Sequence, residues 1–242
     1  VSQARELWAK VNRSNVLIKV PATVEGLPAI RTLIAEGISV NVTLIFSIER
    51  YAQVIDAFIE GIEIAASQGR NLSTIHSVAS FFISRIDSAV DKELKAVGNA
   101  DLLGKVAVAN AHRAYALFLE KFSQPSWKAL EESGALVQRP LWASTGVKDP
   151  AYADTLYVDT LVAPHTVNTM PQSTLDALID HGVVRGNTIT GNYAEAVEVL
   201  KALSVLGISL DDVTTELEID GVKKFAQAWD ELLENVKAAQ QG

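Results

Sequence analysis

The chain has 242 residues, of which 21 are Lys or Arg and 29 are Asp or Glu, so its formal net charge is −8. A hydrophobic fraction of 48% is typical of a folded protein and excludes a disordered chain. The lack of Cys excludes disulfides and thiolate chemistry, and the acidic balance argues against binding to nucleic acid or an anionic membrane surface. No stretch approaches the roughly 20 apolar residues of a membrane span, and we expect a cytoplasmic protein.

Short apolar runs alternate with longer segments of 3.6-residue periodicity along most of the chain. This alternation is typical of a parallel sheet covered by helices, and it predicts an α/β fold in a single domain, residues 1–242. Strands are predicted over residues 15–21, 38–46, 74–82, 137–144 and 165–171. Helices are predicted over residues 1–8, 26–36, 48–69, 85–97, 102–122, 125–133, 150–162, 173–181, 194–206 and 221–240, with Ser47 as an N-cap.

Other signals favour structural roles or the absence of a site. The four His residues have no metal-ligand spacing, and no glycine-rich nucleotide motif follows a strand, so neither a metal nor a cofactor is expected. We interpret the four Trp residues as core or helix-packing residues. An acidic group near a predicted helix start is interpreted as a solvated face: Asp211, Asp212, Glu216 and Glu218.

Polar residues on two neighbouring strands indicate a functional site. Successive side chains of a strand point to opposite faces, so Asn41 and Thr43 share one face of the second strand, and Lys19 interrupts the apolar first strand. Buried parallel strands are usually apolar on both faces, whereas ligands of α/β barrels gather at the carboxyl ends of the strands. A structural alternative is that Lys19 reaches solvent at a strand end and that the other two side chains bond to backbone at a sheet edge.

The lysine suggests a particular chemistry. Burial in an apolar strand favours the neutral amine over the ammonium ion. A neutral amine attacks a carbonyl to form a Schiff base, whose iminium accepts electrons when the adjacent carbon–carbon bond breaks. Lys19 beside Asn41 and Thr43 therefore indicates class I aldol chemistry.

Five segments resemble motifs of the transaldolase family. The first three are NVLIKVPATVEG at residues 15–26, GISVNVTLIFS at residues 37–47 and SVASFFISR at residues 77–85. Two later segments, RPLWASTGVK at residues 139–148 and VNTMP at residues 167–171, resemble the variant found in actinobacteria and their relatives. The resemblance spans essentially the whole chain.

The resemblance implies a (β/α)8 TIM barrel in which the five predicted strands are strands four to eight. It implies a transferase of the pentose phosphate pathway that moves a dihydroxyacetone unit between sugar phosphates. Sedoheptulose 7-phosphate and glyceraldehyde 3-phosphate would become erythrose 4-phosphate and fructose 6-phosphate. The expected partners are therefore sugar-phosphate substrates, while the oligomeric state is left open.

The resemblance also implies roles for individual residues. Lys19 would form the Schiff base, Asn41 would bind substrate hydroxyls and Thr43 would position the catalytic water. Arg85 would be the main phosphate ligand, since a guanidinium donates two parallel hydrogen bonds to phosphate. The remaining substrate-binding candidates are Ser80, Phe82, Ser144 and Lys148.

The chain departs from the family pattern in two respects. Where other subfamilies have a second phosphate-binding arginine, this chain has Gly146, so Lys148 becomes the candidate. The family's proton-relaying aspartate, an asparagine and a water-holding glutamate precede the segment at which this chain begins. We therefore expect a chain that lacks the N-terminal third of the barrel.

Two other functions are compatible with the sequence. A related sugar-phosphate aldolase with the same lysine would release free dihydroxyacetone, because its carbanion is protonated. A non-catalytic sugar-phosphate-binding fragment is the alternative from a different class, and the missing acids favour it. Labelling of Lys19 by a substrate discriminates between the enzymes and the fragment.

Overall fold

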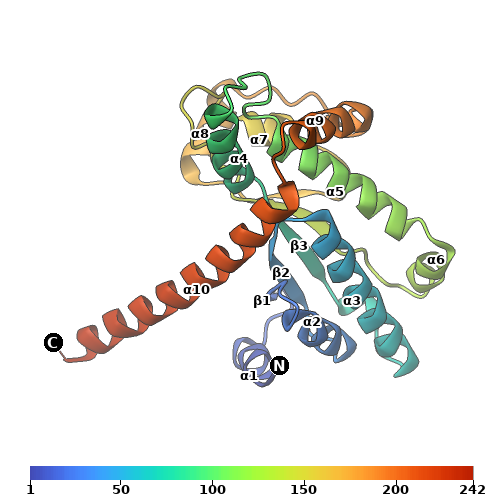
Figure 1. Cartoon of the computed structure of the whole chain (residues 1–242). Helices are drawn as coiled ribbons and strands as arrows, with labels where there is room; N and C mark the ends of the chain where they lie inside the picture. Colours follow the sequence, from blue (N-terminus) through green and yellow to red (C-terminus); the bar gives the residue numbers. More distant parts are fainter. Residues whose placement is uncertain (242) are drawn as a thin grey trace.

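The computed structural model describes residues 1–241 and contains a parallel five-stranded sheet (Figure 1). The strands follow one another across the sheet in chain order, which confirms the predicted α/β class and all five predicted strands. Each strand is shorter than its apolar run because the run includes residues of the adjoining loops. The strands are β1 Ile18–Pro21, β2 Val40–Ile45, β3 Ser77–Phe82, β4 Arg139–Ala143 and β5 Val167–Asn168.

Helices connect the strands and cover the sheet. Helix α3 begins after Ser47, whose Oγ accepts a hydrogen bond from the backbone N–H of Arg50 at 3.0 Å, so the predicted N-cap is confirmed. The helices are α1 Ser2–Val11, α2 Gly26–Ala35, α3 Ile48–Ser67, α4 Ser84–Ala96, α5 Val106–Phe122, α6 Pro125–Glu132, α7 Leu156–Asp159, α8 Gln172–His181, α9 Tyr193–Val205 and α10 Leu210–Gln241, with a 3-10 turn at Leu72–Thr74.

Helices α2 and α3 pack on the sheet, and α5 lies beside α3 (Figure 1). Aromatic rings join the outer helices: the centroids of Phe122 and Trp127 are 4.7 Å apart, and Phe58 lies 5.9 Å from Trp127. Trp127 and Trp142 are fully buried, as predicted. The prediction is wrong for Trp229 on α10, which is 59% exposed.

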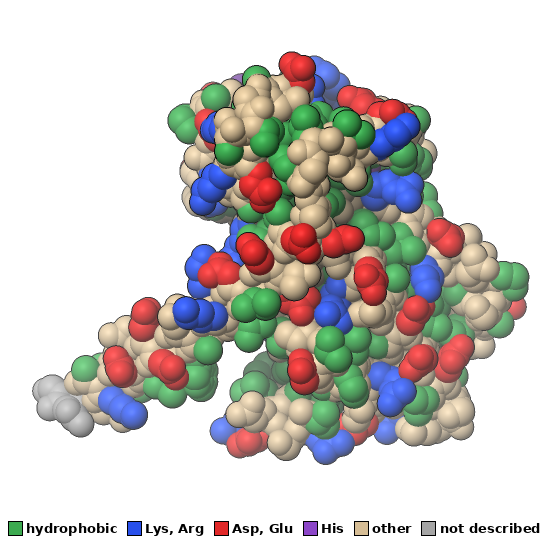
Figure 2. Space-filling model, in the orientation of Figure 1, with side chains coloured by type: hydrophobic (Ala, Val, Ile, Leu, Met, Phe, Trp, Pro, Cys, Tyr) green, Lys and Arg blue, Asp and Glu red, His purple; other side chains and the backbone are tan. Residues whose placement is uncertain are grey.

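Helix α10 differs from its predicted start at residue 221. It begins at Leu210, and Gly221 lies inside it. A Cβ at position 221 would lie 2.9 Å from Leu44 Cδ2, so glycine permits α10 to approach β2 closely. Beyond this crossing α10 extends away from the sheet, and apolar side chains line its lower side in Figure 2. No described helix is both long and apolar enough to cross a membrane.

Candidate functional site

The parallel register brings three of the predicted site residues onto one face of the sheet. Lys19 on β1 is the register partner of Asn41 on β2, and Asn41 is the partner of Val78 on β3. Since side chains alternate along a strand, Ser80 lies on the same face as Val78. The site therefore extends across three adjacent strands.

Asn41 and Ser80 form a direct side-chain contact. Ser80 Oγ donates to Asn41 Oδ1 at 2.8 Å, and Ser80 is only 3% exposed. Strand β2 lies between β1 and β3, so the alternative that Asn41 occupies a sheet edge is wrong. Because Ser80 occupies Oδ1, the amide nitrogen Nδ2 is the group that Asn41 presents to a ligand.

Thr43 follows Asn41 on the same strand and is 1% exposed. Its Oγ1 has no hydrogen-bond partner among the described residues. A buried hydroxyl without a partner carries a free-energy cost of about 1–3 kcal/mol. A water or a substrate hydroxyl that forms a hydrogen bond with Thr43 Oγ1 would remove this cost.

Lys19 is exposed, which corrects the expectation that its strand would bury it. β1 lies at one side of the described sheet, and only β2 pairs with it there. Lys19 Nζ lies 5.5 Å from the ring centroid of Phe225 on α10, and no carboxylate forms an ion pair with it within residues 1–241. The amine is therefore accessible, with an aromatic face beside it.

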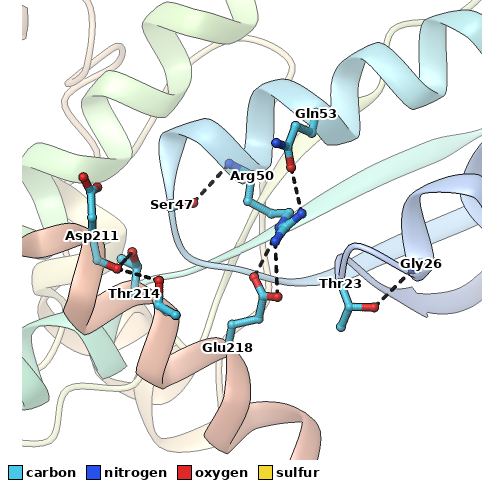
Figure 3. Close-up of polar contacts among 9 residues, drawn as sticks. Thr23, Gly26, Ser47, Arg50, Gln53, Asp211, Thr214 and Glu218 are labelled. Carbon is cyan, nitrogen blue, oxygen red and sulfur yellow. Dashed lines mark hydrogen bonds and ion pairs between the residues drawn. The ribbon is translucent and has the colours of Figure 1, made fainter.

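A tight turn connects β1 to α2. A Cβ at position 26 would clash with the carbonyl oxygen of Pro21, so only glycine fits the turn into α2. The backbone N–H of Gly26 also donates to Thr23 Oγ1 at 3.1 Å, which is drawn in Figure 3. This turn fixes the end of the strand that carries Lys19.

Arg85 lies in the first turn of α4, directly after β3. Its Cζ is 5.1 Å from the ring centroid of Phe82, and the Phe82 ring packs on Phe46 at 5.2 Å. Arg85 Nη1 is buried and has no hydrogen-bond partner in the described part of the chain. The aromatic ring thus supports a guanidinium that retains a free donor for an anion.

Ser144 lies at the end of β4, in the left-handed region at φ 56°. Its Oγ is 2.9 Å from Ser84 Oγ, and its carbonyl oxygen accepts the backbone N–H of Ser84 at 3.0 Å. These bonds join the end of β4 to the start of α4. Ser144 is therefore placed next to the residue that precedes Arg85.

Lys148 is exposed and lies in the loop after β4. It lines a cavity of about 310 Å³ together with Lys92 and Lys95, which lie farther along α4 than Arg85. Lys95 forms an ion pair with Asp149 at 3.2 Å. Asp87, Asp91 and Asp149 line the same cavity, so Lys148 belongs to a rim of mixed charge and not to the group formed by Asn41 and Ser80.

Helix α10 crosses the ends of β1 and β2, and sequence reasoning missed this contribution. Glu218 pairs with Arg50 of α3 at 3.2 Å, with side-chain exposures of 22% and 16% (Figure 3). The interpretation of Glu218 as a solvated acidic residue is therefore wrong. Asp220 also faces this region, and its pKa is lowered mainly by the Lys224 side chain and less by the charge of Arg85. Gly221, in a segment of helical periodicity, was the available signal of a close contact.

Within residues 1–241, no group of three or more His, Cys, Asp or Glu side chains is arranged to hold a metal ion. The polar groups of the site are instead an amine, an amide, hydroxyls and a guanidinium. These groups suit a substrate with a carbonyl, hydroxyls and an anionic group.

The chain is similar in sequence to known transaldolases. A family model described as transaldolase/fructose-6-phosphate aldolase matches residues 1–236. The chain is 58% identical over 239 residues to a transaldolase of Thermobifida fusca, covering 98% of this chain and 65% of the relative. It is 59% identical over 234 residues to a transaldolase of Acidothermus cellulolyticus, covering 96% of this chain and 63% of the relative. A transaldolase of Mycobacterium bovis is 54% identical over 242 residues, covering 98% of this chain and 65% of the relative. The chain thus spans slightly less than two thirds of the length of each of these relatives.

Proposed function

Because the chain belongs to the transaldolase/fructose-6-phosphate aldolase family, we propose that it carries the Schiff-base centre of a transaldolase. The enzyme transfers a dihydroxyacetone unit from a ketose phosphate to an aldose phosphate, as in the pentose phosphate pathway. One observation carries the proposal: Lys19, Asn41 and Ser80 share a face of adjacent parallel strands. Arg85 follows the third of these strands, and its buried Nη1 has no hydrogen-bond partner within residues 1–241.

Lys19 is the nucleophile in this proposal. Its amine attacks the ketose carbonyl carbon, and loss of water from the carbinolamine gives an iminium ion. The bond between C3 and C4 then breaks as the C4 hydroxyl gives its proton to the water held by Thr43, and the electron pair moves into the iminium to form an enamine. The first aldose phosphate leaves, and the enamine carbon attacks the aldehyde of the second. The proton returns to the aldehyde oxygen of the second aldose phosphate when the new carbon–carbon bond forms, and hydrolysis frees Lys19.

Polar groups beside Lys19 orient the substrate. Asn41 directs Nδ2 toward the dihydroxyacetone hydroxyls because Ser80 holds its Oδ1. Thr43 holds the water that is released and later consumed, since its buried Oγ1 lacks a protein partner in the described residues. Asn41 and Thr43 thus hold the substrate and the water in a fixed orientation relative to Lys19, which lowers the entropic cost of the reaction.

The anionic end of the substrate is bound at α4. Arg85 donates to the phosphate, Phe82 supports the guanidinium, and Ser144 contributes a hydroxyl beside the same helix start. Lys148 adds a weaker, longer-range attraction, because it lies in a cavity whose lysines are balanced by Asp87, Asp91 and Asp149.

We further propose that the five strands belong to a single (β/α)8 barrel domain, as its strands four to eight. The sequential parallel order supports this proposal, since neighbours along the chain are neighbours around such a barrel. Phe82 lies at the carboxyl end of β3, and Arg85 and Ser144 follow the carboxyl ends of β3 and β4, where barrel enzymes bind their substrates.

A sugar-phosphate aldolase is the second candidate because the family description includes fructose-6-phosphate aldolase. The two reactions share the iminium and enamine and differ only in what the enamine attacks. Incubation with fructose 6-phosphate alone releases dihydroxyacetone from an aldolase. A transaldolase requires an aldose phosphate acceptor for turnover.

Trapping of the Schiff base tests the proposal. After incubation with fructose 6-phosphate and borohydride, peptide mass spectrometry is expected to find the reduced dihydroxyacetone adduct on Lys19. Lys19→Arg should give no adduct, because arginine has essentially no neutral form near neutral pH. Lys92→Arg is the matched control and should be labelled at Lys19 like the unmodified protein. An adduct on another lysine would refute the assignment, and no adduct would favour the non-catalytic fragment.

A further inference from the structure

A second cavity, of about 420 Å³, lies between α5, α7, α9 and the loop that follows α8. None of its lining residues comes from the strands that carry Lys19, Asn41 and Ser80. Its size is within the range of roughly 300–1,000 Å³ that is usual for small-molecule sites. Its apolar walls are formed by Val108 and Ala109 on α5, Leu156 on α7, and Ala196 and Val199 on α9.

Two cations, Lys105 and Arg185, and two carboxylates, Asp159 and Glu195, line this cavity. Lys105 lies at the start of α5, and Arg185 lies in the loop after α8. Both side chains are exposed, and neither forms an ion pair or a side-chain hydrogen bond with another described residue. Their charges are therefore available to an anionic ligand.

A carboxylate with a free oxygen lines the same cavity. Asp159 Oδ2 accepts a hydrogen bond from Thr155 Oγ1 at 2.6 Å. Asp159 Oδ1 is buried and has no partner within residues 1–241. A carboxylate oxygen accepts hydrogen bonds only, so its missing partner is a donor such as a hydroxyl group.

The walls are held in place by bonds between elements. His112 Nε2 lies 3.1 Å from the carbonyl oxygen of Thr160, which joins α5 to α7. Burial lowers the pKa of His112, so its ring stays neutral near pH 7. The backbone N–H of Thr188 donates to the carbonyl oxygen of Val162 at 2.8 Å, and the backbone N–H of Val162 donates to Thr188 Oγ1 at 3.0 Å. The loop that carries Arg185 is therefore anchored next to the cavity.

We propose that this cavity binds a small organic anion that also carries hydroxyl groups. Lys105 and Arg185 bind the anionic group, and Asp159 Oδ1 accepts from a hydroxyl. The apolar walls cover the carbon skeleton, which an inorganic anion does not have. The cavity uses none of the proposed catalytic residues, so this ligand binds independently of the Schiff-base reaction.

NMR of the protein with labelled Ala and Val methyl groups tests the proposal, because alanine and valine side chains line the cavity. Glucose 6-phosphate is the probe, and inorganic phosphate and glucose are titrated in parallel. Saturable shifts are expected at Val108, Ala196 and Val199 with glucose 6-phosphate, and weaker binding is expected for each comparison probe. Shifts confined to Val78, on the face that carries Asn41, would overturn the proposal without affecting the proposed transaldolase centre.

Substitutions test the anion-binding residues separately from Asp159. Arg185→Ala and Lys105→Ala change exposed side chains, and each is expected to weaken glucose 6-phosphate binding about tenfold. Arg113→Ala, an exposed arginine on α5 outside the cavity lining, is the matched control and should leave binding unchanged. Equal effects of Arg185→Ala and Arg113→Ala would refute the anion site.

Asp159→Asn tests the contact to the hydroxyl group. The expected result is weaker binding of glucose 6-phosphate with little change for inorganic phosphate, because only the sugar supplies the donor. Equal changes for both probes would refute the assigned role of Asp159. Unchanged methyl resonances of Val40 and Val42 on β2, outside the cavity, serve as a check that each variant retains its fold.

Discussion

Asp87 on α4 should make the free energy of unfolding fall as the pH rises, which is the opposite of the usual effect of an aspartate. Its side chain is 1% exposed, accepts the backbone N–H of Ala107 at 2.8 Å and accepts the hydroxyl of Tyr157 at 2.7 Å. Burial raises its pKa from 3.8 to about 6, although both hydrogen bonds oppose the shift. The folded state therefore holds the Asp87 proton more tightly than the unfolded state does.

The magnitude follows from this difference in pKa. Stability falls with rising pH wherever the folded state binds more protons, so the contribution of Asp87 is lost between about pH 4 and pH 6. A shift of about 2 units corresponds to about 3 kcal/mol. Most of that change, about 2.5 kcal/mol, occurs between about pH 4 and pH 7.5.

Urea unfolding at constant ionic strength measures this effect. Between about pH 4 and pH 7.5, the free energy of unfolding of the unmodified protein should fall by about 2.5 kcal/mol relative to that of Asp87→Asn. Asp101→Asn, at an exposed position, controls for the change in net charge. Parallel pH profiles for the unmodified protein and Asp87→Asn would refute the reasoning, whatever their offset.

Two further substitutions test the phosphate site and the contact of α10. Arg85→Ala should weaken binding of phosphorylated substrates by about 1.5–3 kcal/mol, through loss of a charged hydrogen bond, while Lys148→Ala should cost about 1 kcal/mol or less because this lysine is exposed. Isothermal titration with phosphorylated and unphosphorylated sugars measures both, and equal losses for the two sugar types with Arg85→Ala would contradict its role. Glu218→Gln should lower the free energy of unfolding by about 1–3 kcal/mol, since its ion pair with Arg50 is largely shielded from solvent. Urea unfolding with Glu216→Gln as the exposed control checks this value, and equal effects of the two substitutions would argue against an energetic role for the pair.

Local patterns were sufficient to predict the strands of this fold. Apolar runs separated by helical periodicity predicted all five strands in order, because strand and helix periods are properties of short segments. Ser47 was identifiable as an N-cap for the same reason, since its hydroxyl bonds only three residues away. Lys19, Asn41 and Thr43 on neighbouring strands also suggested aldol chemistry, whereas the role of Arg85 was predicted only from the family resemblance.

Tertiary structure decided the contacts that depend on residues distant in the chain. Only the sheet register placed Ser80 against Asn41, 39 residues apart. Only packing brought Glu218 to Arg50, 168 residues away, and allowed Gly221 to lie inside a helix. The exposure of Lys19 likewise followed from which strands flank β1 rather than from its own apolar sequence. Sequence by itself determined the order of the strands and suggested which side chains react, whereas helix α10, burial and the choice of hydrogen-bond partners depended on long-range packing that no local pattern encodes.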